Sequence, residues 1–255
     1  MIEFRALGTI DLRDPAKGPL DGVVARRKLV AILAHMLLVR PVGFHPRDSL
    51  IAVFWPESSQ TRARRALNQA LYELRKALGE DVIVSRGSEE VGLDPDRIRC
   101  DADAFEQMLE RGDRTVALDL YAGDLLPSFA LPGAPEFESW LDERRWDLRA
   151  KALRAARERA EELAVEGNRV EAVYWLRQAL RWEPYDERIL RKLLAHLVAL
   201  GDRTGALREY HAFAGRLEEI DVEPAPETHK LVAGIPTYSG ALRRSQLALR
   251  LSQTA

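Results

Sequence analysis

The stretch RRALNQALYELRKALG, residues 64–79, decides how the first part of this chain folds. Residues three or four apart share one face of an α-helix, which has about 3.6 residues per turn. On that spacing the apolar residues of 61–78 form one stripe, which consists of Ala63, Ala66, Leu67, Ala70, Leu71, Leu74, Ala77 and Leu78. The stripe predicts a helix that packs on neighbouring helices, and Gly79 is typical of the residue that ends one.

The other face of this helix is polar and basic. It carries Thr61, Arg62, Arg65, Asn68, Gln69, Tyr72 and Lys76, with Arg64 and Arg75 on one flank and Glu73 on the other. Arginine and lysine neutralise DNA phosphates, and asparagine and glutamine can read adenine through paired hydrogen bonds. Taken alone, such a face is more typical of a solvated amphipathic helix, so the neighbouring sequence has to distinguish the two interpretations.

The neighbouring sequence predicts a winged helix. The expected elements are one or two short strands within 2–12, a turn at 14–22, helices over 26–40 and 46–54, a helix to Leu78 that Ser58 or Ser59 can cap, and a hairpin over 81–94. In this β–α–α–α–β–β order, residues 60–78 form the third helix, and the second helix of a helix-turn-helix reads the major groove. The setting therefore favours DNA binding over the solvated-helix interpretation.

The composition excludes several classes of protein. Hydrophobic residues make up 46% and charged residues 31% of the 255 residues, as in globular proteins. The single cysteine, Cys100, cannot form an internal disulfide, which predicts a cytoplasmic protein. Charges within 1–14 come too early for a signal peptide, and the longest apolar run, 29–39, is far shorter than the roughly 20 residues that span a bilayer. Residues 1–99 hold 16 basic and 13 acidic residues, a weak excess that suits contact with a polyanion.

The character of the sequence changes at Asp101. Residues 101–112 predict a capped helix, 117–129 another short helix, and 136–217 an almost continuous helical region. Seven basic and six acidic residues lie within 142–162, which indicates a solvated face with ion pairs and not a nucleic-acid patch.

The helical region contains a repeat of 34 residues, which is the tetratricopeptide period. The pairs are Leu163 and Leu197, Gly167 and Gly201, Ala172 and Ala206, and Ala179 and Phe213. We expect the two glycines to allow close backbone approach, the two alanines to sit where a larger side chain would clash, and Pro184 to follow the end of a helix. Repeats of this kind bind partners more often than they catalyse reactions.

The order of these motifs resembles a known family. VFWP, then ARRALNQALYELRKALG, then a hairpin and DADAFE resemble the winged-helix effector domain of response regulators in the version found in the antibiotic-regulatory-protein (SARP) activators of bacteria. The segments at 121–127, 140–149, 183–213 and 222–228 are similar to the bacterial transcriptional activation domain that follows it there. The resemblance covers about 1–235.

The resemblance implies a sequence-specific transcriptional activator. Its winged helix would bind direct repeats of double-stranded DNA near a promoter, with Arg65, Gln69 and Arg75 at positions that face DNA in the family. The helical domain would support homodimers and contact RNA polymerase, and the protein would be associated with the nucleoid when bound. The fold expected is mainly α, with a winged-helix DNA-binding domain over 1–99, an all-α tetratricopeptide-like domain over 100–235, and a tail or linker over 236–255.

The wing departs from the family pattern. Glu89 and Glu90 stand where the resemblance implies a basic or aromatic residue, and carboxylates repel phosphates. Arg86 is then the only helpful wing residue. Three interpretations stay open: weak binding, binding by cooperative dimers, or a scaffold whose winged helix binds protein. The predicted DNA-binding residues are Arg62, Arg64, Arg65, Asn68, Gln69, Tyr72, Arg75, Lys76 and Arg86.

No pattern of residues predicts catalysis. The five histidines, which are His35, His45, His196, His211 and His229, lack the spacing of metal ligands, and no phosphate-binding glycine loop is present. We therefore predict no catalytic residues, no metal and no cofactor, and a protein that is not an enzyme and does not enter the membrane.

Overall fold

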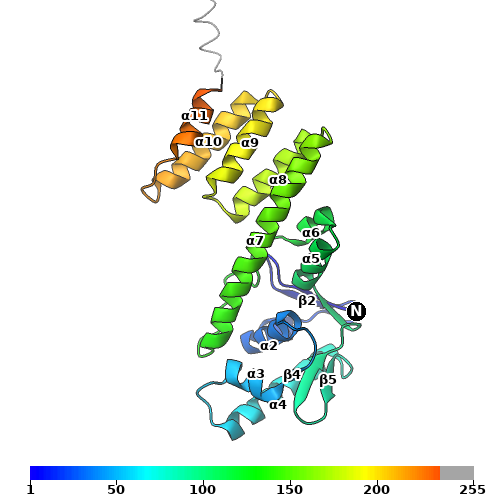
Figure 1. The fold of residues 1–255 in the computed structure, drawn as a ribbon. Coiled ribbons are helices and arrows are strands. Elements are labelled where there is room, and N and C mark those ends of the chain that lie inside the picture. The colour runs from blue at the N-terminus through cyan, green and yellow to red at the C-terminus, as the bar shows by residue number, and fades with distance from the viewer. Residues whose placement is uncertain (236–255) are drawn as a thin grey trace, which may run out of the picture. The chain divides into compact units, whose positions relative to one another are not determined.

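The computed structural model describes residues 1–235, and the predicted tail at 236–255 lies outside the described residues. The chain divides into two compact units, Met1–Ala152 and Leu153–Ala255 (Figure 1). We call them the first and the second unit. The fold is mainly α with an α+β region at the N-terminus, which confirms the predicted fold class. The predicted boundary between residues 99 and 100 falls inside the first unit, and as a division of function it stays a prediction.

The first unit begins with a small sheet. Its strands lie in the order β3 (Gly18–Pro19), β2 (Asp11–Asp14), β1 (Ile2–Arg5) and β7 (Ile98–Cys100), and β1 is antiparallel to β2 and parallel to β7. Ile2, Phe4 and Leu12 are buried, as the loose alternation over 2–12 predicts. The predicted turn at 14–22 is shorter than expected, because it also contains β3 (Gly18–Pro19) and the single-turn helix α1 (Asp21–Val24).

Three helices and a hairpin form the predicted winged-helix outline. The elements are α2 (Arg27–Leu38), β4 (His45–Pro46), α3 (Arg47–Phe54), α4 (Gln60–Leu78), β5 (Ile83–Arg86) and β6 (Glu90–Leu93). The second sheet has the order β4-β6-β5. Gly79 ends α4 with a φ of +120°, a backbone conformation that glycine adopts without strain. The predicted serine cap is wrong, because Ser59 precedes α4 but its side chain makes no capping hydrogen bond.

The next two helices differ from the prediction at their ends. The helix α5 (Asp101–Glu110) has no side-chain cap, because the Asp101 carboxylate accepts hydrogen bonds from the backbone of Ala6 at 2.8 Å and Leu7 at 3.1 Å instead. The helix α6 (Arg114–Leu120) ends nine residues before the predicted limit of 129. Carbonyl groups of the irregular segment that follows accept hydrogen bonds from Arg145, which replaces the helical bonds.

The N-terminal part of α7 (Pro135–Val165) closes the core of the first unit. Phe137 packs 5.3 Å from the ring of Phe54, and Trp140 packs 4.8 Å from His35. The buried carboxylate of Glu106 on α5 accepts hydrogen bonds from three cationic side chains, which belong to Arg40, Arg144 and Lys151. Ion pairs therefore lie along this part of α7, as its charge balance predicts.

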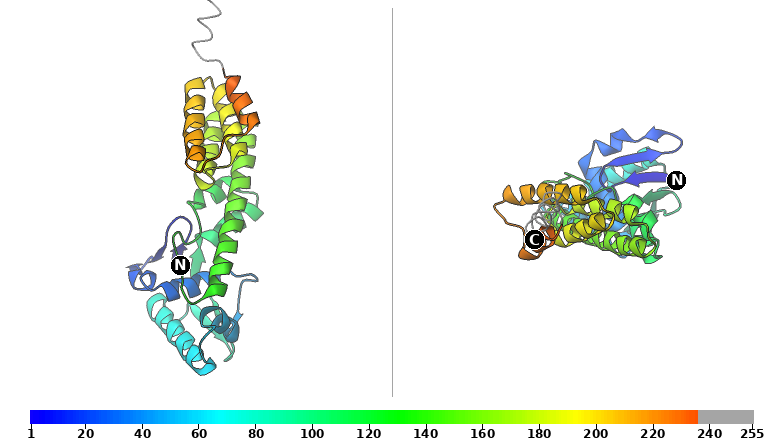
Figure 2. Two further views of the ribbon diagram at one scale, coloured as in Figure 1. Left: turned by 90° about the vertical axis from the view of Figure 1, so that its left-hand side faces the viewer. Right: turned by 90° about the horizontal axis from the view of Figure 1, so that it is seen from above.

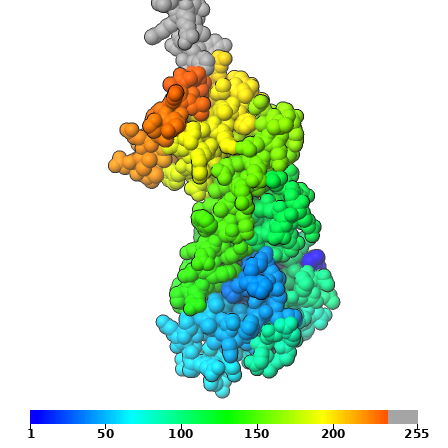
Figure 3. Space-filling model, in the orientation of Figure 1, coloured from blue at the N-terminus to red at the C-terminus, as the bar shows by residue number. Residues whose placement is uncertain are grey.

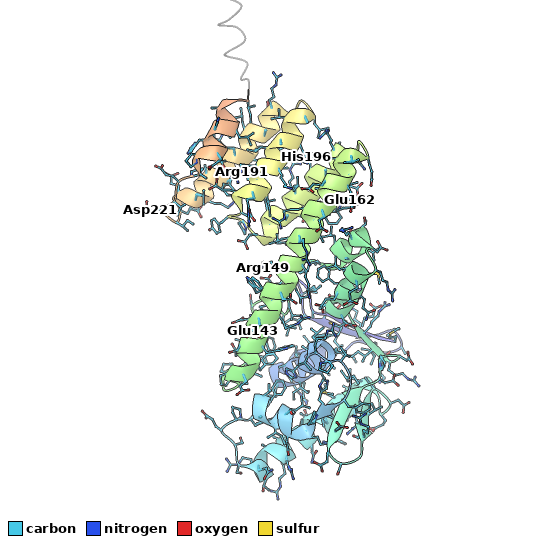
Figure 4. All side chains as sticks on the ribbon, viewed as in Figure 1. Glu143, Arg149, Glu162, Arg191, His196 and Asp221 are labelled. Carbon is cyan, nitrogen blue, oxygen red and sulfur yellow. The ribbon has the colours of Figure 1, made fainter. Side chains whose placement is uncertain are left out.

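Helical pairs form the second unit. After the end of α7 come α8 (Arg169–Trp182), α9 (Glu187–Ala199), α10 (Arg203–Glu218) and α11 (Pro226–Ala233). The equivalent residues of the 34-residue repeat occupy equivalent places, since Leu163, Ala172 and Ala179 are buried like Leu197, Ala206 and Phe213. Arg191 of α9, labelled in Figure 4, donates a hydrogen bond at 3.1 Å to Thr228 at the start of α11.

The role predicted for the repeat glycines is wrong. A Cβ atom added at Gly167 or Gly201 would meet no other atom within 4 Å, so neither glycine serves close approach. Both instead have a positive φ, +83° and +80°, which lets the chain leave one helix and enter the next. Asn168 and Asp202 then cap α8 and α10 with their side chains, a second equivalence at the same interval.

Candidate nucleic-acid interface

The helix α4 presents one buried and one exposed face. Leu67, Leu71 and Leu74 are buried in the first unit, whereas Ala66 and Ala77 at the margin of the predicted stripe are half-buried. The helix lies at the outer side of the first unit, and atoms of α3 and α4 lie at the surface in the space-filling view (Figure 2, left, and Figure 3, cyan). The outer face is therefore open to a partner.

Three predicted side chains on this face extend freely. Arg62, Arg65 and Tyr72 are exposed, and within residues 1–235 none of them has a side-chain partner. The Tyr72 side chain is exposed to 58%. Lys76 is exposed as well and lies near enough to Glu73 to lower the pKa of that carboxyl. The outer face thus offers cations and an aromatic ring over most of the length of α4.

Two other predicted residues of α4 are hydrogen-bonded to carboxylates. Arg64 donates a hydrogen bond to Asp48 of α3 at 3.2 Å, and Gln69 donates one to Glu73 at 3.0 Å. Glu73 also pairs with Arg26, and its pKa is lowered by the Gln69 hydrogen bond and by Arg26. These contacts hold side chains of the face in place and reduce its positive charge.

The wing arginine is also neutralised. Arg86 Nε donates to a carboxylate oxygen of Glu90 at 2.6 Å, and its guanidinium lies 4.5 Å from the centre of the Phe44 ring. The hydrogen bond from Arg86 lowers the pKa of Glu90. Glu89 accepts a hydrogen bond from its neighbour Ser88 at 2.9 Å. The acidic residues of the wing are therefore present at its surface, and one of them binds the arginine expected to help.

Arg75 has a different place from the other predicted residues. Its Nε donates to the carbonyl oxygen of Ile83 at 3.1 Å, and its Nη2 donates to Ser85 Oγ at 3.1 Å. The side chain is half-buried between α4 and β5. Arg75 therefore positions the hairpin against the helix, whatever else it contacts.

Sequence reasoning missed Arg47, the first residue of α3. Its Nη1 donates to Asn68 Oδ1 at 3.0 Å, its Nη2 donates to Ser85 Oγ at 3.3 Å, and its backbone N–H donates to the Glu89 carbonyl at 2.8 Å. Burial, followed by the charge of Arg75, lowers the pKa of Arg47. The signal that could have found it is a basic residue directly after Pro46, at the start of the first helix of the helix-turn-helix.

Within residues 1–235 no histidine is hydrogen-bonded to a side chain of this face. His45 Nε2 lies 3.1 Å from the Met36 carbonyl, and burial lowers the pKa of His35 to about 4, so His35 is neutral near pH 7. His229 Nδ1 lies 3.1 Å from the hydroxyl of Tyr210. Among residues 1–235 no group of three or more possible metal ligands gathers. No helix within that range is long and apolar enough to cross a membrane.

The chain is similar in sequence to one protein family and to two curated relatives. A family model described as bacterial transcriptional activator domain matches residues 102–235. Transcriptional regulatory protein MoaR1, from Mycobacterium bovis (BCG) and Mycobacterium tuberculosis, is 27% identical over an alignment of 271 residues, gaps included, that covers 98% of this chain and 86% of MoaR1. Regulatory protein AfsR of Streptomyces griseus is 30% identical over an alignment of 211 residues, gaps included, that covers 76% of this chain and 21% of AfsR.

The fold is also similar to a solved structure. Mycobacterium tuberculosis EmbR, determined in complex with a low affinity phosphopeptide, superposes with a TM-score of 0.56 and 18% sequence identity. The match covers 99% of this chain and 70% of EmbR. At this identity the likeness concerns the fold alone.

Proposed function

This chain belongs to the SARP group of bacterial transcriptional regulators with a bacterial transcriptional activator domain, and we propose that it activates transcription by binding specific DNA through α4. The observation that supports the proposal is the open face of α4, where Arg62, Arg65 and Tyr72 extend from the second helix of a helix-turn-helix. An α-helix of this kind fits the major groove. MoaR1 is named a transcriptional regulatory protein and AfsR a regulatory protein, which agrees with a binding function.

The proposed complex contains promoter DNA, a second copy of the chain and RNA polymerase. Direct repeats would be read by α4 of two copies, with Arg62, Arg64, Arg65, Asn68, Gln69, Tyr72, Arg75, Lys76 and Arg86 as the residues that face DNA. The second unit consists of helical repeats, and repeats of this kind bind partners more often than they catalyse reactions, which suits contact with protein partners.

The salt dependence of duplex binding tests the proposal. Removal of one phosphate-binding cation flattens the slope of log binding constant against log salt concentration by about 0.9. A variant with Arg62→Gln and Arg65→Gln should therefore have a slope that is flatter by as much as about 1.8. The matched control is Arg13→Gln with Arg99→Gln, which removes the same charge from the N-terminal sheet. Equal slopes for both variants and the wild type would contradict the assignment of α4.

The wing supports a second candidate, a scaffold whose winged helix binds protein. Glu90 neutralises Arg86, and Glu89 adds a further negative charge to the hairpin. A scaffold predicts no salt-dependent duplex binding but a stable complex with polymerase or with a sensor domain. Sequencing the genomic fragments that the protein retains distinguishes the two, since a scaffold enriches no sequence motif.

A further inference from the structure

Two arginines of the first unit share one serine hydroxyl. Arg47 Nη2 lies 3.3 Å and Arg75 Nη2 lies 3.1 Å from Ser85 Oγ. The three residues come from α3, α4 and β5, which lie side by side in the lower part of Figure 1. Two guanidinium groups that meet at one neutral oxygen repel each other, so an anion placed against them would stabilise the arrangement.

The cluster has many donors and few acceptors. A guanidinium offers five N–H donors and no acceptor, and a hydroxyl accepts at most two hydrogen bonds. Because Ser85 Oγ accepts from both arginines, its own hydrogen remains available to donate. Arg47 Nε is buried and lacks a partner within the described chain. The surplus of donors fits an oxyanion, whose oxygens only accept.

The surroundings leave the cluster accessible. Arg47 and Asn68 line a hollow of about 370 Å³ together with Asp48, Arg64, Ser88 and Glu89, and Arg75 and Ser85 lie outside this lining. Ser85 and Asn68 are exposed. Asn68 Oδ1 accepts from Arg47, so the Asn68 amide group keeps its two N–H donors for a ligand. A ligand can therefore approach from the outer face of α4.

The acidic side chains nearby do not fill the cluster. Asp48 binds Arg64, and Glu89 acts on Arg47 by charge, which raises the pKa of Arg47 against the effect of burial. Among residues 1–235 no carboxylate oxygen is hydrogen-bonded to the side chain of Arg47 or Arg75. The positive charge of the two guanidinium groups is thus only partly balanced.

We propose that Arg47, Arg75 and Ser85 form a binding site for one phosphodiester group of duplex DNA, whose non-bridging oxygens accept the free N–H and O–H donors. The proposal rests on DNA binding by α4, because Asn68 joins the cluster to the face of that helix. A phosphate held here carries no base information. It would fix the register of α4 in the groove and the position of the wing.

The first test measures the salt slope of Arg47→Gln on a duplex that the wild type binds. We expect the slope to fall by about 0.9, the value for one phosphate contact. Arg99→Gln removes the same charge from the N-terminal sheet and should keep the wild-type slope. A normal slope for Arg47→Gln, together with a reduced slope for Arg62→Gln and Arg65→Gln, overturns this site and leaves the proposed function intact. A wild type without salt-dependent binding overturns both.

A second variant separates a phosphate site from a purely structural cluster. Ser85→Asp places a carboxylate between the two guanidinium groups, where the phosphate would lie, and Ser85→Asn is the uncharged control. Relative to that control, Ser85→Asp should raise the melting temperature and weaken duplex binding roughly tenfold, because the added charge stabilises the free protein and repels DNA. If Ser85→Asp lowers both the melting temperature and the affinity as Ser85→Asn does, the cluster only holds the hairpin and the proposal fails.

Inorganic phosphate distinguishes a free anion from DNA as the ligand. The melting temperature is measured in phosphate and in chloride at equal ionic strength, for the wild type and for Arg47→Gln. A rise in phosphate that Arg47→Gln abolishes, joined to a reduced salt slope, supports the site. The same rise with an unchanged salt slope assigns the cluster to a free anion and overturns the assignment to DNA.

Discussion

Replacing Glu106 with glutamine should destabilise the first unit more than other charge-removing changes on α5. The Glu106 side chain is only 9% exposed and binds Arg40 and Arg144 at 2.8 Å and Lys151 at 2.5 Å. Burial alone would raise the pKa of Glu106, but the hydrogen bonds from Arg144 and Lys151 outweigh it and lower the pKa from 4.5 to about 2. The carboxylate therefore gains more from its partners than it loses by leaving water.

The pKa shift sets the magnitude of the effect. A difference of one pKa unit corresponds to about 1.4 kcal/mol, so the shift of Glu106 contributes about 3 kcal/mol at pH 7. The Glu106→Gln variant also leaves Arg144, whose side chain is 14% exposed, with a buried charge and one partner fewer. We expect the free energy of unfolding to fall by about 3 kcal/mol.

The loss of stability in Glu106→Gln should depend on pH. Because the folded pKa is depressed, the stabilisation is complete above the unfolded value of 4.5 and is lost as the pH falls through about 2. The difference between the wild type and Glu106→Gln should therefore shrink to about half between pH 7 and pH 3. Urea denaturation of both proteins at a series of pH values measures it.

The exposed carboxylate of Glu110 provides the control for Glu106→Gln. Glu110→Gln removes one carboxylate from the exposed end of α5 and should change the free energy of unfolding by less than about 0.5 kcal/mol. If Glu106→Gln costs no more than this control, or if its cost is the same at pH 3 as at pH 7, the ion-pair reasoning is refuted.

Two further changes test the wing and the repeat. Glu90→Gln frees Arg86 from its carboxylate, so the salt slope of duplex binding should steepen by about 0.9. The control Glu80→Gln removes an exposed carboxylate and should steepen the slope less. If Glu90→Gln gives a slope no steeper than this control, Arg86 is not a phosphate contact. Gly201→Ala should lower the free energy of unfolding by about 1–2 kcal/mol because its φ is +80°, whereas Gly215→Ala within α10 should raise it by about 0.5–1 kcal/mol. Thermal unfolding that ranks these two alanine variants the other way would contradict the backbone argument.

Local patterns predicted the helices and the repeat. The spacing of Leu67, Leu71 and Leu74 identified the buried face of α4, because helical periodicity depends only on neighbours along the chain. Glycine followed by asparagine or aspartate marks the turns of the repeat for the same reason, but the glycines provide a positive φ and not the close backbone approach that the repeat pattern predicts. Those turns need a positive φ, which sequence composition alone does not distinguish from a need for space.

The ends of the short helices α5 and α6 could not be predicted from local patterns. The helix expected to reach residue 129 stops at Leu120, since the carbonyl groups beyond it are satisfied by Arg145, which lies on α7. A donor that comes from a distant helix leaves no trace in the local sequence. The same holds for Asp101, which binds the backbone of Ala6 and Leu7 across the chain instead of capping its own helix.

The sequence alone determined that the chain has a winged helix before a helical repeat, and that α4 carries basic and amide side chains opposite its apolar stripe. Only the tertiary structure decided which of those charges are free. Arg26 reaches Glu73 across 47 residues, and Arg47 reaches Asn68 across 21. Charge interactions depend on distance in space, so folding neutralises part of the face of α4. Folding also brings Arg75, which the sequence pattern placed on α4, close to Arg47 of α3, which the pattern did not identify.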